Sequence, residues 1–238
     1  MALGAVLLML AAAACGTRSS GYAAADDTGP GARDRAGWSR MSAIPERLLP
    51  DGTTILVGDP SAPITLSLYE DPRCPSCSDF ETSGAGPTVR RLVLERRVQV
   101  RYTLASFLDR DGGQGSKKAV NALRAALDQD RFVELHERVF LLQPTGAQDG
   151  FTDDYLLRLA DGVDGLRGKA FDSAVRDMSH RRFVAASQQR FDADGATGTP
   201  SMKIDGQWLP EDYGGVLYEP DIFEDFLVLF REDPELLP

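Results

Sequence analysis

The stretch that decides the fold reads Tyr69-Glu70-Asp71-Pro72-Arg73-Cys74-Pro75-Ser76-Cys77. It follows an apolar, β-branched run at 64–69 and precedes a segment of helical period, so Cys74 falls where a strand passes into a helix. Pro75 suits the first turn of a helix, because the N–H that proline lacks would have no partner there. We therefore expect Cys74 at the N-terminus of a helix and Cys77 one turn farther along.

A cysteine at a helix N-terminus has a lowered pKa, because the free N–H groups and the positive end of the helix dipole favour the thiolate. The pKa of such a thiol can fall from about 8.5 to between about 3.5 and 7.5. We expect Cys74 to be the attacking sulfur and Cys77 the resolving one, since the i, i+3 spacing places both on one helix face. Arg73 adds a positive charge beside Cys74, although an exposed arginine is as often simply solvated.

A C-x-x-C pair can also be half of a zinc site. Structural zinc takes four ligands, and besides the cysteines the chain offers only His136 and His180, both far along the sequence in helical segments. The sequence therefore favours a redox pair, and no metal or cofactor is expected.

The charge of the chain excludes one class of partner. The net charge is −10, from 36 acidic and 26 basic residues, and residues 205–238 contain ten acids against Arg231 alone. Such a chain has no electrostatic reason to bind phosphate backbones, so nucleic acid is not expected as a partner. Apolar residues make up 42%, which is enough for a sizeable globular core.

The N-terminus has the features of an export signal. The apolar run from Ala2 to Ala14 is too short to cross a membrane, which takes about 20 residues, but it has the length of a signal-peptide core. The junction Ala12-Ala13-Ala14-Cys15-Gly16 resembles a bacterial lipobox, which predicts cleavage before Cys15 and a lipid anchor on it. No Lys or Arg precedes the run, and an ordinary signal peptide that leaves Cys15 as a free thiol is the alternative.

The hydrophobic pattern divides the chain into five segments. We expect a signal peptide at 1–14, a flexible tether at 15–50, the two parts of one α/β domain at 51–115 and 193–238, and a helical insertion at 116–192. Strands are expected at 53–57, 64–69, 97–104, 201–204 and 216–218, and a helix bent near 84–87 should follow Cys74. The last helix begins at Pro220 and should bury Ile222, Phe223, Phe226, Leu227 and Phe230.

Three blocks in this order resemble the DsbA-like thiol:disulfide oxidoreductases, in their extracytoplasmic, membrane-attached bacterial form. They are Ala62-Pro63-Ile64-Thr65-Leu66 leading through Cys74-Pro75-Ser76-Cys77 to Phe80, then Phe132, His136, Phe140 and Gln143 on one helix, then Gly195, Gly198-Thr199-Pro200-Ser201. The resemblance covers roughly residues 53–230. It implies a thioredoxin fold with an inserted all-helical subdomain.

The resemblance also implies a function and further site residues. The Thr199-Pro200 bond is expected to be cis, to pack against the cysteine pair and to bind an incoming peptide as an added strand. The implied activity is thiol:disulfide exchange on exported, cysteine-containing proteins, as an oxidase that a membrane redox partner recycles. The implied location is the outer face of the cytoplasmic membrane, or the exterior if Cys15 is not lipidated.

One departure from the family concerns the buried acid. The buried acid that many thioredoxin-fold enzymes carry six residues before the first cysteine falls on Leu68 here. Glu70, in phase with Leu68 on the strand, is a candidate proton relay, against its interpretation as a solvated residue at the strand's end. His136 lies on an apolar seam and is expected to be a packed core histidine, not a catalyst.

The redox direction is open, because the dipeptide between the cysteines is Pro-Ser, without the histidine of the strongest oxidants of the family. A dedicated extracytoplasmic reductase and a redox-switched binding protein are the alternatives to an oxidase. The reduction potential, which depends on hydrogen bonding around the sulfurs, separates an oxidase from a reductase.

Overall fold

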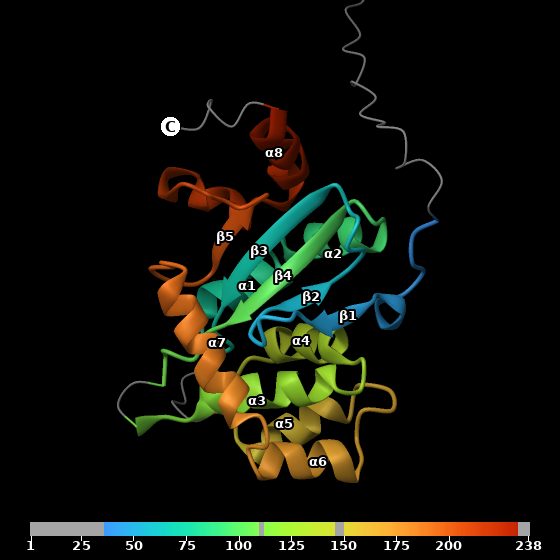
Figure 1. Ribbon diagram of the computed structural model, residues 1–238, viewed down its shortest axis with the longest axis vertical. Helices are drawn as coiled ribbons and strands as arrows, with labels where there is room; N and C mark the ends of the chain where they lie inside the picture. The colour runs from blue at the N-terminus through green and yellow to red at the C-terminus, as the bar shows by residue number, and fades with distance from the viewer. Residues whose placement is uncertain (1–35, 110–111, 146–149, 233–238) are drawn as a thin grey trace, which may run out of the picture. The chain divides into compact units, whose positions relative to one another are not determined.

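The computed structural model describes residues 36–109, 112–145 and 150–232. The described residues contain a six-stranded sheet in the order β1-β2-β4-β3-β5-β6 (Figure 1). The strands are β1 (Glu46–Leu48), β2 (Ile55–Val57), β3 (Ile64–Glu70), β4 (Val98–Leu104), β5 (Ser201–Ile204) and β6 (Gln207–Trp208). β3 and β4 are parallel, and every other neighbouring pair is antiparallel.

The central strand β3 carries the chain into the cysteine motif. Its residues alternate in the way a sheet requires, so that Leu66 and Leu68 are buried beside Val100 and Tyr102 of β4. Glu70, the last residue of β3, pairs in register with Leu104. The sheet thereby holds Glu70 four residues before Cys74.

Two helices follow β3 on one face of the sheet, and the break between them lies at the bend predicted near 84–87. α1 (Pro75–Thr82) and α2 (Gly86–Leu94) are separated by a tight turn. A Cβ on Gly84 would lie 2.6 Å from the carbonyl oxygen of Leu217, and one on Gly86 would lie 2.7 Å from Cα of Glu81. Glycine is needed at both positions because backbone approaches too closely for any side chain.

Among the described residues, five α-helices lie between β4 and β5, where the sequence predicts a helical insertion. They are α3 (Gly115–Leu127), α4 (Phe132–Leu141), α5 (Asp153–Ala160), α6 (Lys169–Arg176) and α7 (Arg181–Ala193), and α3 packs on α4, α6 and α7 (Figure 1). α4 also packs on α1, and α7 returns to the sheet, where the hydroxyl of Ser187 accepts a hydrogen bond from Leu104 N. The insertion therefore contacts both the active-site helix and the sheet.

The segment after β6 differs from the prediction. Residues 216–218, expected as a strand, belong to the 3-10 helix η3 (Glu211–Tyr218), whose Leu217 carbonyl accepts a hydrogen bond from Ala85 N. The chain therefore packs beside the α1–α2 turn instead of pairing with a strand. α8 (Pro220–Glu232) begins where predicted and buries Phe223, Leu227 and Phe230. Ile222 was expected inside but is 54% exposed, because the inward face of the helix is set by these three residues.

The predicted tether is too long at its C-terminal end. The 3-10 helix η1 (Met41–Ala43) and β1 lie within residues 15–50, and Ile44 is buried in the main core. Glu46 of β1 accepts hydrogen bonds from Phe132 N and Val133 N at 2.6 and 2.9 Å, which attaches β1 to the start of α4. The signal peptide and Cys15 lie outside the described residues. Among the described residues, no helix is both long and apolar enough to span a bilayer.

Candidate active site

The two cysteines occupy the positions that the sequence predicts. Cys74 is the N-cap of α1 with Pro75 directly after it, and Cys77 lies in the first turn of that helix. Both are free thiols, and Cys74 is 6% exposed while Cys77 is fully buried. An incoming thiol or disulfide therefore meets Cys74 first.

The surroundings shift the two thiols in opposite directions. The pKa of Cys74 falls from 9.0 to about 6, mainly because the Cys77 side chain donates a hydrogen bond to it, with further contributions from the Thr199 side chain and the Cys77 N–H. Burial raises the pKa of Cys77 well above 9.0, and the hydrogen bond to Cys74 and the charge of Glu70 add to this. Near neutral pH the reduced pair is therefore one thiolate and one thiol.

The loop before β5 lies against Cys74. The Thr199-Pro200 peptide bond is cis, as the resemblance implies, and the Cys74 thiol donates a hydrogen bond to the Thr199 carbonyl with an Sγ to O distance of 3.1 Å. The Thr199 hydroxyl is buried and has no hydrogen-bond partner in the dithiol form among the described residues. It is thus available to the thiolate when Cys74 ionises.

Hydrogen bonds to Gln143 of the insertion and to the chain after β4 hold the cysteine loop in place. Gln143 donates from Nε2 to the carbonyls of Pro72 and Cys74, at 2.8 and 2.9 Å. Arg73 donates to the Leu108 carbonyl at 2.6 Å and forms an ion pair with Asp109. The guanidinium of Arg73 is therefore neither simply solvated nor directed at Cys74.

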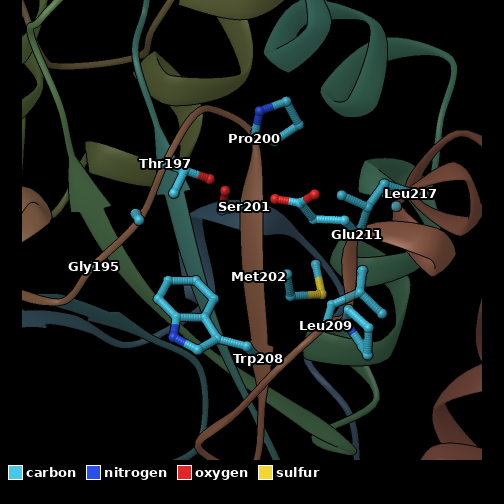
Figure 2. A pocket seen from close by; sticks show the side chains of 12 residues that line it. Gly195, Thr197, Pro200, Ser201, Met202, Trp208, Leu209, Glu211 and Leu217 are labelled. Atoms are coloured by element: carbon cyan, nitrogen blue, oxygen red, sulfur yellow. The ribbon is translucent and has the colours of Figure 1, made fainter. Parts of the chain in front are cut away.

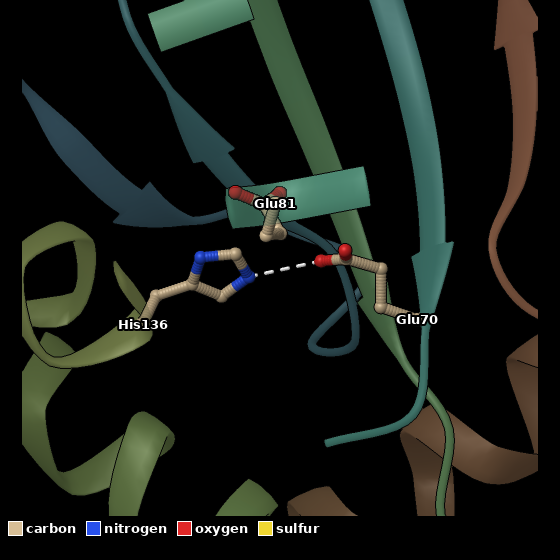
Figure 3. A group of neighbouring side chains, drawn as sticks. All are labelled: Glu70, Glu81 and His136. Carbon is tan, nitrogen blue, oxygen red and sulfur yellow. Dashed lines mark hydrogen bonds and ion pairs between the residues drawn. The ribbon is translucent and has the colours of Figure 1, made fainter. Parts of the chain in front are cut away.

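Behind the cysteines, Glu70 belongs to a buried cluster with Glu81 of α1 and His136 of α4 (Figure 3). Glu70 is 0% exposed, so its interpretation as a solvated residue is wrong. Its Oε2 lies 2.9 Å from His136 Nε2. Arg90 of α2 completes the cluster, donating to Glu81 Oε2 at 2.6 Å and to the Glu81 carbonyl at 2.9 Å.

Burial keeps these groups largely neutral. Desolvation, followed by the charge of Cys74, raises the pKa of Glu70 well above 4.5, and desolvation with the charge of Glu70 raises the pKa of Glu81 to about 7. Desolvation lowers the pKa of His136 to about 4. Near neutral pH the two carboxyls thus retain at least one proton, and the imidazole is neutral. His136 is buried as predicted, but it hydrogen-bonds to Glu70 rather than serving only for packing.

The cluster could hold a metal ion by distance alone, since one donor atom from each of the three side chains lies within 4.8 Å of the others. Arg90 already places a positive charge on Glu81, and a carboxyl proton supplies the rest of the compensation that buried acids need. A metal cation would have to displace both Arg90 and the carboxyl proton. The donor set therefore fits a proton-sharing network better than a metal site.

A cavity of about 430 Å³ lies beside Pro200, on the side of β5 and β6 (Figure 2). Its lining combines polar and apolar surface in similar amounts, and it includes Met202, Trp208, Leu209 and Leu217, with Glu211 as a charged group. It extends the surface next to Cys74 into a groove of a size that can take side chains of a peptide.

Sequence analysis did not identify Glu81, Arg90 or Gln143 as site residues. Glu81 had a signal, because it lies four residues after Cys77 and therefore on the same face of α1. Arg90 had none that a single sequence reveals, since it reaches the site from α2 through tertiary packing. Gln143 had one, because it ends the second block that resembles the family, although it reaches the cysteine loop from the chain after α4.

Comparisons with known proteins agree with this geometry. The sequence profile of the family described as Thioredoxin matches residues 50–214. The fold is similar to that of oxidised BdbD from Bacillus subtilis, with a TM-score of 0.63, 19% identity, and coverage of 75% of this chain and 92% of BdbD. Reduced DsbA from Mycobacterium tuberculosis aligns with a TM-score of 0.51 and 26% identity, over 65% of this chain and 80% of that one.

A curated relative matches over a shorter stretch. The serine/threonine-protein kinase PknE of Mycobacterium tuberculosis is 37% identical over 67 residues, which are 28% of this chain. The match spans only 11% of the length of PknE. On the profile match and the shared architecture, the chain belongs to the thioredoxin family and has the fold of the DsbA-like thiol-disulfide oxidoreductases.

Proposed function

We propose that this protein catalyses thiol:disulfide exchange on cysteine-containing exported proteins, as an oxidase, with Cys74 and Cys77 as its redox-active disulfide. The observation that carries the proposal is the opposite shift of the two thiol pKa values across a single helical turn. A sulfur with a low pKa is a good leaving group, and a buried sulfur with a high pKa is protected from solution reactants.

The oxidase reaction begins with the Cys74–Cys77 disulfide. A substrate thiolate attacks Cys74 Sγ, the S–S bond to Cys77 breaks, and Cys77 leaves as a thiolate that must gain a proton because it is buried. A second substrate thiolate then attacks the substrate sulfur that is bonded to Cys74. Cys74 leaves as a thiolate, and the substrate departs with a disulfide. Two electrons pass from the substrate to the enzyme, and a membrane redox partner would take them up.

Glu70 is the proposed proton relay for Cys77. It is buried behind the pair, its pKa is raised by burial, and its charge affects the pKa of Cys77. A protonated Glu70 can give its proton to the Cys77 thiolate in the oxidase direction. When the partner reoxidises the enzyme, Cys74 attacks the partner's disulfide and forms a mixed disulfide with it. Cys77 then loses its proton to the Glu70 carboxylate and attacks Cys74 Sγ, and the partner's sulfur leaves as a thiolate.

Substrate peptides are proposed to bind along Thr199 and Pro200, with side chains in the adjoining cavity. The Thr199 backbone already accepts a hydrogen bond from Cys74, and Thr199 and Pro200 directly precede β5, outside the residues of β5 that pair with β6. The cavity lined by Trp208, Leu209 and Leu217 would take an apolar side chain near the substrate cysteine.

The oxidase direction is supported by the low pKa of Cys74, because stabilising the thiolate stabilises the reduced enzyme and makes its disulfide more oxidising. The reductase and the redox-switched binding protein remain the competing functions. A reduction potential near about −270 mV would favour the reductase, while one near about −120 mV would favour the oxidase. A binding protein would not turn over a reduced, unfolded substrate.

For location, we propose export and a lipid anchor at Cys15, which would hold the domain at the outer face of the cytoplasmic membrane. The proposal is supported by the apolar run before Cys15 and by the lipobox-like junction. Disulfides persist outside the cytoplasm, which is where an oxidase has substrates.

The test compares single substitutions in a Cys15→Ser background, so that the active-site pair is the only source of thiols. Cys74→Ser should abolish oxidation of a dithiol peptide, while Cys77→Ser should accumulate mixed disulfides visible on non-reducing gels. Alkylation of the reduced protein near pH 7 should modify Cys74 first. Preferential alkylation of Cys77, or full turnover by Cys74→Ser, would overturn the assignment.

A further inference from the structure

His136 is the side chain that lies between the acid behind the cysteines and a second, small cavity. Its Nε2 lies 2.9 Å from Glu70 Oε2, while Nδ1 points away from Glu70 (Figure 3). His136 also lines a cavity of about 10 Å³, in which His136, Arg90 and Tyr102 are the polar side chains and the rest of the lining is apolar. That volume has room for about one water molecule. Glu70 itself does not line this cavity, so His136 stands between the two.

This small cavity lies away from the substrate side. The cavity is bounded by η1, α2 and α4, whereas the substrate cavity beside Pro200 is bounded by β5, β6 and η3. Arg90, at its rim, has a side chain that is 19% exposed. Cys77 and Glu70 are both fully buried. A substrate joined to Cys74 would also keep solvent from reaching them on the side of Cys74.

The titratable and charged groups around His136 come from several elements. They are Glu70 of β3, Glu81 of α1, Arg90 of α2, Tyr102 of β4 and Glu137 of α4. The one cation, Arg90, is held by Glu81 and lies 3.9 Å from Glu137. Burial keeps His136 neutral near pH 7, so that one ring nitrogen can accept a proton while the other releases one.

We propose that His136 exchanges protons between Glu70 and the cavity at Arg90, so that the acid serving Cys77 stays in equilibrium with solvent while a bound substrate covers the cysteines. The inference rests on the proposed exchange function and deepens it. During reoxidation the proton leaves Cys77 for Glu70, passes to His136 Nε2, and is released from Nδ1 to water in the cavity. The charge of Glu81 favours the protonated ring as the proton passes, whereas Arg90, held by Glu81, disfavours it and so promotes release of the proton. His136 touches neither sulfur, so it is a positioning residue that acts through Glu70.

The test separates the two chemical steps of the pair. Reduced protein in the Cys15→Ser background is mixed with a chromogenic aromatic disulfide, which releases one coloured thiol when Cys74 attacks and a second when Cys77 resolves the mixed disulfide. His136→Gln keeps a polar group beside Glu70 but cannot pass a proton between two nitrogens. The matched control is His180→Gln, since His180 is the other histidine of the chain and pairs with Asp128 at the surface.

His136→Gln should slow the second phase about tenfold and alter its solvent isotope effect, while the first phase and the pKa of Cys74 stay unchanged. His180→Gln should match the unsubstituted protein in both phases. A second phase of normal rate in His136→Gln overturns the inference, as does equal slowing of both phases or equal slowing by His180→Gln. If the unsubstituted protein fails to oxidise a dithiol peptide in repeated turnovers, the proposed function fails instead.

If His136→Gln does not fold, nitrogen NMR of the unsubstituted protein gives the answer. With two histidines in the chain, the His180→Gln spectrum assigns both. The His136 ring-nitrogen shifts should differ between the dithiol and disulfide forms, because Glu70 changes its proton occupancy with the state of Cys77. Identical shifts in the two forms would overturn the inference.

Discussion

Replacing Thr199 by valine tests the origin of the low pKa of Cys74. The Thr199 side chain lowers that pKa, and its hydroxyl is buried without a partner in the dithiol form among the described residues. Valine has nearly the same shape and removes only the hydroxyl, so the fold should not lose stability. The pKa of Cys74 should rise from about 6 toward 9.0, but not reach it, because the hydrogen bonds from Cys77 remain.

The size of the effect follows from linkage. With a pKa of about 6, about nine in ten Cys74 sulfurs are thiolate at pH 7, against about one in a hundred for a pKa of 9.0. The lowered pKa therefore favours the reduced pair about elevenfold at pH 7, which is about 30 mV for a two-electron couple. Thr199→Val should lower the potential by a part of this, and by no more than about 30 mV.

The same shift fixes the pH dependence. Below the pKa of Cys74 the reduced pair binds two protons, so the potential falls by about 59 mV per pH unit; above it, with Cys77 still protonated, the fall is about 30 mV per unit. The change of slope should lie near pH 6 in the unsubstituted protein and higher in Thr199→Val.

The assay is equilibration with glutathione buffers at several pH values, quenched with acid and resolved by mass. Thiolate absorbance in the reduced protein gives the pKa of Cys74 directly. The matched control is Thr197→Val, two residues earlier in the same loop and lining the cavity beside Pro200. An unchanged pKa and potential in Thr199→Val, or a shift no larger than that of Thr197→Val, would refute the reasoning.

Three further predictions concern stability and location. The folded-state pKa of Glu81 is about 7 and its ordinary value is 4.5, so the folded protein binds this proton more tightly than the unfolded chain does. The free energy of unfolding, compared with that of Glu81→Gln, should therefore rise by up to about 3 kcal/mol as pH falls from 7 to 4.5. Denaturant titrations in which this difference does not vary with pH would contradict the prediction. Gln143→Leu leaves two carbonyls of the cysteine loop without their donor and should cost about 1–3 kcal/mol, so an unchanged melting temperature would argue against that anchor. Cys15→Ala should move the protein from the membrane to the soluble fraction, since two acyl chains suffice for stable attachment, and persistent membrane association would exclude a lipid anchor there.

Local pattern was sufficient to predict several elements correctly. Pro75 predicted the start of α1, the glycine-proline cluster at 84–87 predicted its bend, and the change to helical period predicted α3 to α7. These predictions succeeded because each depends on interactions within a few residues, namely proline's missing N–H, glycine's missing side chain and the 3.6-residue period.

The errors occur where long-range packing decides. Val216 has strand character, but Leu217 meets the backbone of Ala85 and the segment becomes η3. Residues 46–48 look like tether, yet they pair with β2, and Glu46 binds the start of α4. Local propensity is a weak constraint compared with a hydrogen-bonding partner brought from 86 or more residues away.

The sequence by itself determined the redox pair, its place at a helix N-terminus, and the order of sheet, helical insertion and proline loop, because cysteine spacing, Pro75 and hydrophobic period are local signals. Only the tertiary structure decided the state of Glu70. From the sequence it could be a solvated strand end or a proton relay, and the choice depends on burial and on the neighbouring charges. The fold brings together Glu70 of β3, Glu81 of α1, Arg90 of α2 and His136 of α4, which are far apart in the sequence. Removal from water shifts the pKa values of Glu70, Glu81 and His136, and this makes the cluster a proton network.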